Sequence, residues 1–599
     1  MMSRFVTFFV LCSTVFACTS SIRIVVFLQG TFEHDNHPLQ YIAQFLANRN
    51  HKVAAVKNVI IPEEKKLVKH RLHDVRELVI NAGAEPDVIG NLTAVWKTVP
   101  WDDAYDTVRI ARAYWRALVP ACQALIDSDV MERVREGRYD VALVYAGDPC
   151  QLAVAHLLAI PVVYLDQQGF TDETAVAASD TWPGGHIPSS NSVFRQRMTV
   201  SERFVNSLHW LREYAVHSGI APLARLVNAR FAGLDEPIWR IFADDYEVKK
   251  HFDQFPTIAQ LKRQAAIYML NSDPALEFYG REVLPNVVYV GGYHIEPPKP
   301  LFSPWNETIA HTSGGLVICS FGRRVSFSAM PDVTMMSLMT SFSKFHSTRF
   351  FVLTDDINVP EGVLVPDNVN LTRHVPQQEL LASGAVRMFI TAGGMHSLME
   401  AAVFGVPVLM VPFTAPQYSN ARKFEQHGLG VILEKDNITV DTLTSAMRQV
   451  LDNPKYKMAA RNWKRAYDER PLDGLNTMLY WLEYVGGYHG AAFLSPSPVG
   501  LDATANSPLS MALRWAARSG LDLLFIFVVW PTLTIRAAAW LLAKLTLVRN
   551  TGADAMETGE FNGGKRLVKE SSQEKKKAKK STECAAKQDT STGDAKKQR

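Results

Sequence analysis

One stretch in the second half of the chain has residue types and spacing that suit phosphate chemistry. Within residues 370–433, two apolar runs at 388–390 and 408–411 alternate with helical patterns of about a dozen residues, as in a βαβ unit. A glycine turn, Ala392-Gly393-Gly394, lies between the first apolar run and the next helix. Because such a turn brings backbone N–H groups and a helix N-terminus against an anion, the stretch predicts a phosphate-bearing ligand.

The elements around this turn predict two doubly wound domains. Strand patterns alternate with helical ones throughout, and they lie at residues 22–28, 52–56, 139–145, 160–165, 316–320 and 350–353. A helical pattern over 38–48 follows the first strand, and a helical return over 472–488 follows the last part. Prolines and glycines cluster near 291–300 and divide a domain at 21–290 from another at 291–490. The predicted fold class is therefore α/β, with two Rossmann-like domains.

This fold predicts where ligands bind. Ligands of doubly wound sheets lie beyond the carboxyl ends of the strands, so one domain would hold the phosphate-bearing ligand and the other a second substrate. Neither first strand is followed by a G-x-G-x-x-G fingerprint, which disfavours a dinucleotide-dependent dehydrogenase. The formal net charge is only +3, and residues 544–599 alone carry 14 Lys and Arg against 8 Asp and Glu. A nucleic-acid partner is therefore not expected.

Both ends of the chain predict a translocated body with a membrane anchor. Residues 1–20 combine a basic residue, an apolar run and small residues, which is the pattern of a signal peptide. After a juxtamembrane segment at 491–522, residues 523–543 are apolar enough and long enough for a transmembrane helix across a core of roughly 30 Å. The Lys-rich tail at 544–599 should be disordered and cytoplasmic. The alternative is a helix that lies on the membrane, which the lack of a polar face disfavours.

Cysteines and glycosylation sequons bear on the same question. Between the two predicted segments the cysteines are Cys122, Cys150 and Cys319, an odd and widely spaced set that does not indicate a disulfide framework. Four N-x-T sequons lie before residue 500, where a translocated body would be glycosylated, and they begin at Asn91, Asn306, Asn370 and Asn437.

Six segments form a set that identifies a family. They are LPNVVYVGG at 284–292, HVPQQELL at 374–381, FITAGGMHSLMEAAVFGVPVLMVP at 389–412, PQYSNA at 416–421, HIPSSNSVFRQRMTVSERFVN at 186–206 and YWLEYVGGYHGAAFLSP at 480–496. Together they resemble the UDP-glycosyltransferases, animal UDP-glucuronosyltransferases in particular, over nearly the whole chain. The resemblance implies a GT-B type fold and a single-pass type I protein of the endoplasmic reticulum membrane, with a lumenal body. The final Lys596-Lys597-Gln598-Arg599 also resembles a dilysine retrieval signal.

The resemblance implies a donor site around the glycine turn. Gln377 would contact the uracil or ribose, Glu400 would accept hydrogen bonds from the ribose hydroxyls, and the site would be completed by His374, Gly393, Gly394, His396, Ser397 and Gln417. His396 and Glu400 are four residues apart, hence on one helix face, and a serine in the first helical turn lies where N–H groups are free. The alternative for each residue alone is a solvated side chain or a helix cap.

Several positions depart from the family pattern. Ala392 replaces the usual His of the glycine turn, and Pro416 replaces an Asp that holds sugar hydroxyls. His374 stands where a Trp is common, and Arg323 replaces a Ser. A cation at residue 323 can still bind phosphate or a sugar carboxylate.

The catalytic pair departs as well. The family uses a His after the first strand as general base, oriented by an Asp after a later strand. A gapless alignment puts Asp35 and Tyr145 at these two positions. A small shift in each loop restores a pair of His34 and Asp148, and Asp35 could instead act as the base. The remaining alternative is that these residues, with His37, are ordinary loop residues.

Two functions follow from this pattern. The first is an inverting transferase that moves a hexose or glucuronic acid from a UDP-sugar to a hydroxyl of a small lipophilic acceptor, with UDP-sugar as co-substrate and no metal or other cofactor. The second is an inactive binding protein of the same fold in the endoplasmic reticulum membrane. Membrane attachment also makes a homo-oligomer plausible.

Overall fold

Nearly continuous apolar runs build two fully parallel sheets, because strands buried on both faces need apolar residues at every position. The computed structural model describes residues 21–31, 33–61, 72–81, 84–102, 107–178, 185–217, 236–322, 325–491, 494 and 529–557. The first sheet has the order β3-β2-β1-β4-β5-β6-β7, with strands β1 (Arg23–Leu28), β2 (Lys52–Val59), β3 (Val75–Asn81), β4 (Val141–Tyr145), β5 (Val162–Asp166), β6 (Ile267–Leu270) and β7 (Val287–Tyr289). The second has the order β10-β9-β8-β11-β12-β13, with β8 (Leu316–Ser320), β9 (Arg349–Leu353), β10 (Val369–Thr372), β11 (Val386–Thr391), β12 (Val408–Met410) and β13 (Gly430–Ile432).

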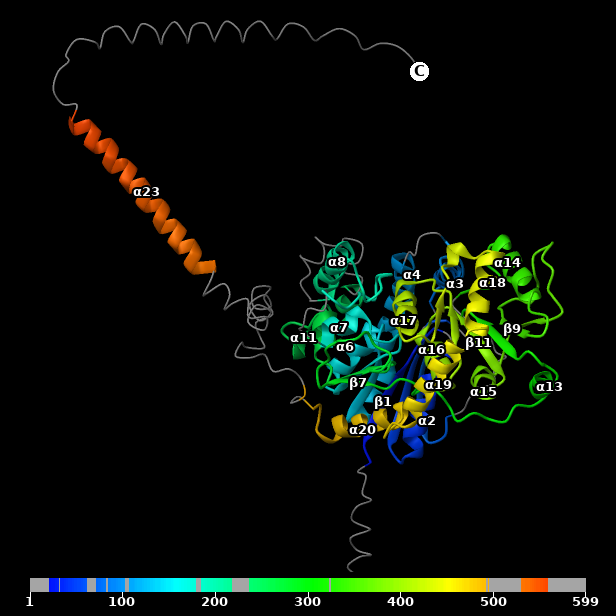
Figure 1. Cartoon of the computed structure of the whole chain (residues 1–599). Coiled ribbons are helices and arrows are strands. Elements are labelled where there is room, and N and C mark those ends of the chain that lie inside the picture. Colours follow the sequence, from blue (N-terminus) through cyan, green and yellow to red (C-terminus); the bar gives the residue numbers. More distant parts are fainter. Residues whose placement is uncertain are drawn as a thin grey trace, which may run out of the picture. The chain divides into compact units, whose positions relative to one another are not determined.

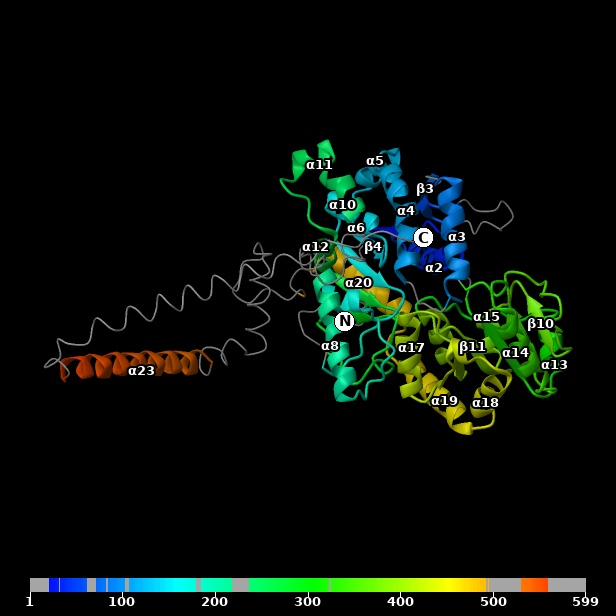
Figure 2. The same cartoon turned by 90° about the horizontal axis from the view of Figure 1, so that it is seen from above.

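Helices cover both sheets (Figures 1 and 2). Those of the first part are α2 (Glu33–Asn48), α3 (Pro86–Thr98), α4 (Thr107–Ile126), α5 (Asp129–Gly137), α6 (Pro149–Leu157), α7 (Asp172–Ala178), α8 (Val200–His217), α10 (Glu236–Ala243), α11 (Tyr246–His251) and α12 (Ile258–Arg263). Those of the second are α13 (Trp305–Ala310), α14 (Asp332–Ser343), α15 (Gln377–Ala382), α16 (Met395–Val403), α17 (Ala415–Gln426), α18 (Val440–Leu451), α19 (Pro454–Asp468) and α20 (Gly474–Gly487). The prediction of two Rossmann-like α/β domains is confirmed.

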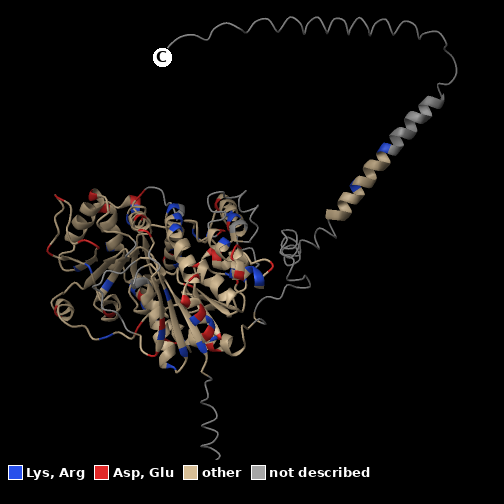
Figure 3. Cartoon of the chain, turned by 180° about the vertical axis from the view of Figure 1, so that it is seen from behind, with Lys and Arg blue, Asp and Glu red and all other residues tan. Residues whose placement is uncertain are grey.

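The last helix of this body returns to the first domain. Apolar residues of α20, among them Met478, Leu482 and Val485, share a core cluster with Ile24 and Leu143 of the first sheet. The domain that is second in sequence therefore contributes its final helix to the packing of the first. Lys, Arg, Asp and Glu are interspersed over both domains (Figure 3).

The chain divides into two compact units, residues 1–497 and 498–599. In the second unit the structure describes α23 (Trp530–Glu557). In the parts of the chain that the structure describes, no helix is both long and apolar enough to cross a membrane. Residues 523–528 of the predicted span, the predicted signal peptide, most of the juxtamembrane segment and residues 558–599 lie outside the described residues. Because α23 continues to Glu557, the first part of the predicted disordered tail is helical instead.

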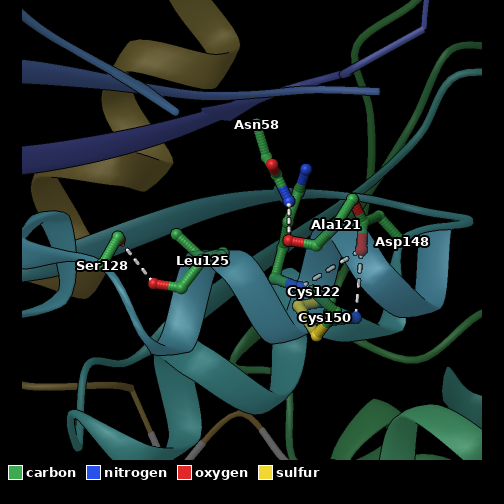
Figure 4. Close-up of a disulfide and its surroundings, with 8 residues drawn as sticks. Asn58, Ala121, Cys122, Leu125, Ser128, Asp148 and Cys150 are labelled. Atoms are coloured by element: carbon green, nitrogen blue, oxygen red, sulfur yellow. Dashed lines mark hydrogen bonds between the residues drawn. A yellow bond between two sulfur atoms is a disulfide. The ribbon is translucent and has the colours of Figure 1, made fainter. Parts of the chain in front are cut away.

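The structure contains a disulfide that the spacing of the cysteines did not indicate. Cys122 of α4 and Cys150 of α6 are bonded, and Cys319 is a buried free thiol (Figure 4). Nearby, Asn58 of β2 donates to the Ala121 carbonyl at 2.7 Å. The pairing was missed because 28 residues separate the two cysteines in sequence. Only the packing of α4 and α6 in one core cluster brings the cysteines together.

Candidate active site

The glycine turn lies where the sequence predicts it, between β11 and the N-terminus of α16. Gly393 has a φ of +86°, which favours glycine, and a Cβ there would lie 3.0 Å from the carbonyl oxygen of Gln417. Gly394 is the N-cap of α16, and as a glycine it has no side chain to cap this end. The N–H groups of the first helical turn are therefore available to an anion.

Glu400 lies in α16 and is the centre of a buried polar cluster. The residue is only 7% exposed. Gln378 donates to its Oε1 at 3.0 Å, and Gln377 donates to its Oε2. Both glutamines belong to the first turn of α15, so polar side chains of two adjacent helices meet at the Glu400 carboxylate. Gln377 and Glu400 were both predicted as site residues, and they are direct partners in the structure.

A histidine from the segment after β7 completes this cluster. His294 Nε2 lies 3.6 Å from Glu400 Oε1 and 3.2 Å from the carbonyl oxygen of His396. The two imidazoles meet edge to face with centroids 4.4 Å apart. Tyr293 brings its hydroxyl to 3.2 Å from His396 Nε2. His396, which the sequence placed in the site, is therefore held from the segment that joins the domains.

Burial sets the charges in this cluster. Removal from water raises the pKa of Glu400, and the hydrogen bonds from Gln377 and Gln378 oppose that rise. Burial, with a smaller contribution from His396, holds the pKa of His294 well below its ordinary value. His294 is therefore neutral at neutral pH, and Glu400 is stabilised mainly by amide donors rather than by a cation.

Sequence reasoning missed Tyr293, His294 and Gln378. The signal was present, since Tyr293 and His294 directly follow the segment 284–292 that carried part of the resemblance. Nothing in the one-dimensional pattern placed that segment against α16, which begins about a hundred residues later.

The other predicted donor residues lie around α16 with different partners. Ser397 is half-buried in the first turn of α16, and His374 is exposed. Gln417 accepts hydrogen bonds from the backbone N–H groups of Phe413 and Thr414 at 2.8 and 3.1 Å. Its side-chain oxygen therefore caps α17, and Pro416 occupies a position near the start of that helix where proline is well tolerated.

The predicted catalytic residues lie at the carboxyl edge of the first sheet. Asp148 is the N-cap of α6, after β4, and accepts from the N–H groups of Cys150 and Gln151 at 3.0 and 3.3 Å (Figure 4). Burial raises the pKa of Asp148 to about 6, and these hydrogen bonds only partly oppose the rise. Gln151 in turn donates to the Leu28 carbonyl at 2.9 Å.

His34 and Asp35 belong to the first turn of α2, whereas the sequence placed them in a loop. The predicted helix starts late because Pro38 looked like a first-turn residue, and the helix in fact continues through it. Their side chains lie outside the described part of the structure. Since β1 and β4 are neighbouring parallel strands, α2 and Asp148 follow adjacent strand ends. His37 is exposed, with Nε2 at 3.3 Å from Glu296, and Tyr145 is buried at the end of β4.

A second contact between the domains crosses the carboxyl edge of the second sheet. Residues 97–102, which comprise the last two residues of α3 and the segment after it, touch the loops that follow four of the strands of the second sheet. Lys97 lies 4.0 Å from Asp355 after β9, and Trp101 donates to the Ser326 carbonyl after β8 at 2.7 Å. Trp101 also meets Phe413 after β12. We name residues 97–102 the strap.

The strap ends at a buried lysine. Lys435, after β13, donates to the carbonyl oxygens of Pro100, at 3.2 Å, and of Asp102. In the order β9-β8-β11-β12-β13, the strap contacts the loops on both sides of β11. The loop after β11 is the glycine turn itself. The strap therefore runs along the edge at which the anion site opens.

Fold and site define a class of two-domain α/β proteins that carry an anion-binding glycine turn at the carboxyl edge of the second sheet, with residues of both domains beside it. Within this class, the chain belongs to the UDP-glucoronosyl and UDP-glucosyl transferase family, whose sequence profile matches residues 32–502. Family and fold together indicate a glycosyltransferase that uses a UDP-sugar donor and a second, acceptor substrate.

Curated relatives belong to the same family. The chain is 27% identical to rat UDP-glucuronosyltransferase 1A8 over 77% of this chain and 82% of that protein. It is 26% identical to mouse UDP-glucuronosyltransferase 1A1 over 76% and 81%. The crystal structure of the calicheamicin glycosyltransferase is similar with a TM-score of 0.49 and 15% identity, over 79% of this chain and 99% of that one.

Proposed function

We propose that this protein transfers a hexose or glucuronic acid from a UDP-sugar to a hydroxyl of a small lipophilic acceptor, with inversion at the anomeric carbon. The observation that carries the proposal is the buried Glu400, held by amide donors from Gln377 and Gln378 beside an uncapped helix N-terminus. A carboxylate next to an anion site suits a ribose diphosphate, because the carboxylate accepts from the ribose hydroxyls while N–H groups meet the phosphates.

The donor site works through charge and position. The N–H groups after Gly394, together with His396 and Ser397, hold the diphosphate, and no metal is required because these donors balance the charge of the leaving UDP. Gln377 and the exposed His374 hold the uracil and ribose side of the nucleotide. The sugar lies towards Gly393 and Gln417, where the strap closes the edge of the sheet.

The transfer step takes a proton from the acceptor. His34 accepts the hydroxyl proton, the acceptor oxygen bonds to the anomeric carbon from the face opposite UDP, and the bond to the UDP oxygen breaks with its electron pair. Asp148 orients His34 and stabilises its protonated form. In an alternative arrangement Asp35 takes the proton directly. Either arrangement agrees with the position of α2 and Asp148 after adjacent strands.

The second candidate is a binding protein that retains the donor site without turnover. It is favoured by the altered family positions, which are Asp35, Tyr145, Arg323, Ala392 and Pro416. In the structure, the side-chain oxygen of Gln417 also accepts a backbone hydrogen bond that caps α17. Residues 323 and 324 lie outside the described residues.

We also propose that the body lies in the lumen of the endoplasmic reticulum. Support comes from the Cys122–Cys150 disulfide, since disulfides persist in oxidising compartments. The asparagines of the four sequons are all exposed, as glycosylation needs. The anchor over 523–543 and a homo-oligomer stay predictions from the sequence.

One experiment separates the two candidates. UDP release is measured from UDP-glucose and UDP-glucuronic acid with a panel of phenols and steroids, in parallel with calorimetry of UDP binding. A transferase binds UDP and releases it only with acceptor, and His34→Ala then abolishes most of the release. Binding with no release by the unmodified protein favours the binding protein. A chain that does not bind UDP contradicts both candidates.

A further inference from the structure

The side chain of Tyr293 joins the core of the first domain to the glycine-turn helix of the second. Tyr293 follows β7 and is fully buried, in the same core cluster as Leu143 and Leu165 of the first sheet. Its hydroxyl lies 3.2 Å from Nε2 of His396, which belongs to the first turn of α16. The aromatic ring is thus fixed in one domain, while its polar atom contacts the other.

The surroundings of this hydroxyl fix the direction of the hydrogen bond. Burial, together with Asp166 and Tyr145 nearby, raises the pKa of Tyr293 well above its ordinary value, so the phenol keeps its proton. Among the residues that the structure describes, the acceptor within reach of that proton is Nε2 of His396. If Nε2 donated instead, the phenol proton would be buried without an acceptor, which costs free energy. The hydroxyl of Tyr293 is therefore the donor.

This direction in turn fixes the tautomer of His396. A ring nitrogen that accepts a hydrogen bond carries no proton, so the proton of the neutral imidazole lies on Nδ1. Nδ1 is one bond closer than Nε2 to the backbone of α16, whose first turn presents N–H groups to an anion. A second proton, on Nε2, would set two donors against each other. Tyr293 therefore opposes the charged, imidazolium form of His396.

Three further titratable groups lie around this pair. The imidazole of His294 meets that of His396 edge to face, with centroids 4.4 Å apart. Burial, followed by His396 and by His37 of α2, lowers the pKa of His294, which is therefore neutral at neutral pH. The carboxylate of Glu400, one turn further along α16, accepts hydrogen bonds from two glutamine amides. Two uncharged imidazoles thus lie together, near a carboxylate that amide donors hold.

We propose that Tyr293 is a positioning residue that keeps His396 as the neutral Nδ1–H tautomer, so that His396 meets the diphosphate as an N–H donor and not as a cation. The contact of His396 with the diphosphate rests on the proposed function, whereas the tautomer does not. Because Tyr293 belongs to the core of the first domain, a movement of the domains that breaks its hydrogen bond would also free His396 to take up a proton. The first domain thereby controls a charge in the donor site of the second.

Nitrogen-15 NMR of the full chain with labelled histidine reads the tautomer without any ligand. The signals of His396 are those that disappear in His396→Gln. Nε2 should be unprotonated and Nδ1 protonated, with no change between pH 8 and pH 6. In Tyr293→Phe, which keeps the ring in the core, the proton should move to Nε2 and the ring should titrate in this range. A proton on Nε2 of the unmodified protein would overturn the proposal, as would the same titration in both proteins.

Tyr467→Phe is the matched control. The hydroxyl of Tyr467 donates to the carbonyl oxygen of Gly291 at 3.0 Å, so this variant loses a hydrogen bond to the same segment without touching His396. Its His396 signals should equal those of the unmodified protein. A change of tautomer in Tyr467→Phe would assign the effect to loosening of the segment and overturn the specific role of Tyr293.

Calorimetry of UDP binding at pH 8 and pH 6 tests the consequence for the donor site. The ratio of the Kd of Tyr293→Phe to that of the unmodified protein should fall several-fold from pH 8 to pH 6, because the freed His396 becomes a cation beside the diphosphate. Protonation of Glu400 affects both proteins and cancels in the ratio. The fall should be absent in Tyr467→Phe and when Tyr293→Phe is combined with His396→Gln.

The outcomes of the calorimetry separate this proposal from the proposed function. A ratio that does not change with pH, in proteins that bind UDP, would overturn the role of His396 as a neutral donor to the diphosphate. Failure of every protein to bind UDP would contradict the proposed function instead, and the NMR result would still decide whether Tyr293 sets the tautomer of His396.

Discussion

Gln378 and Glu400 are joined across two helices, with the amide Nε2 of the first 3.0 Å from the carboxylate Oε1 of the second. Gln377 holds the other carboxylate oxygen, so two adjacent side chains of α15 fix one acidic group of α16. The proposed ribose acceptor is therefore positioned before any ligand binds, which lowers the entropic cost of binding.

The first prediction concerns that carboxylate. Glu400→Ala should weaken UDP binding by about 1 to 3 kcal/mol, because ribose hydroxyls lose their acceptor. Since burial raises the pKa of Glu400, affinity should also fall as the pH is lowered and the carboxylate takes up a proton. Calorimetry at neutral and mildly acidic pH measures both effects. Glu400→Gln cannot ionise at this position, so its affinity for UDP should be weak and should not depend on pH. Equal affinity in all three proteins would refute the ribose assignment.

The glycine turn offers a matched pair of variants. Gly393→Ala should lower the free energy of unfolding by about 1 to 2 kcal/mol and weaken UDP binding. The reason is that φ is +86° and the new Cβ lies 3.0 Å from the carbonyl oxygen of Gln417. Gly394→Ala is the control, since Gly394 has a φ of −65° and no heavy atom lies within 4 Å of a Cβ there. Thermal unfolding should separate the two variants. Similar losses in both variants would show that backbone strain is not the cause.

The strap should hold the two domains together through Trp101. Its ring lies 4.8 Å from Phe413 and 6.2 Å from Phe321, centroid to centroid. Because Trp101 is half-buried, Trp101→Ala should lower the free energy of unfolding by about 2 kcal/mol, somewhat less than the loss expected for a fully buried Trp. Hydrogen exchange should quicken at residues 325–328 and 411–414. Trp101→Phe keeps the ring contacts but loses the hydrogen bond to Ser326. Its stability should therefore lie between those of the unmodified protein and Trp101→Ala. Unchanged exchange in Trp101→Ala would contradict a clamping role.

The disulfide should contribute to stability. For a separation of 28 residues, the chain-entropy estimate is about 3.6 kcal/mol. Reduction should therefore lower the melting temperature of the purified protein, and the double variant Cys122→Ala with Cys150→Ala should melt at a similar temperature with or without reductant. A reductant effect that persists in the double variant would locate the redox-sensitive group elsewhere.

Asp148 should make stability depend on pH. Its folded pKa is about 6 against an ordinary 3.8, so the folded state binds its proton more tightly than the unfolded state. The stabilisation from this group is full below about pH 4 and is lost as the pH rises through 6, a change of about 3 kcal/mol. Asp148→Asn should remove this slope from denaturant unfolding curves measured between those values. The same slope in the variant would assign it to another group.

Activity should respond to Asp148 in the opposite direction. If ionised Asp148 orients His34, transfer should fall as the pH drops below about 6, where the carboxyl group becomes protonated. The pH profile of the catalytic rate measures this, with Asp148→Asn as the comparison. A catalytic rate of Asp148→Asn equal to that of the unmodified protein at neutral pH would remove Asp148 from the mechanism.

The two α/β domains and the glycine turn could be predicted from the sequence alone. Both are local properties, since apolar runs of strand length alternate with helical patterns, and residues 392–394 lie next to the helix they serve. It also selected Gln377 and Glu400, which the structure shows to be partners. The prediction for β8 matches residue for residue because its run is short and bounded by turn residues.

Which distant residues share a site depends on how the helices and strands pack, and it could not be predicted from the sequence. The partners of α16 include His294, and the glycine turn lies beside a strap that contains Trp101, hundreds of residues earlier in the chain. Cys122 and Cys150 meet because α4 and α6 pack together, and Asp148 acquires its high pKa from burial. Each of these depends on contacts between elements, and contact between elements leaves no periodic signal in the sequence.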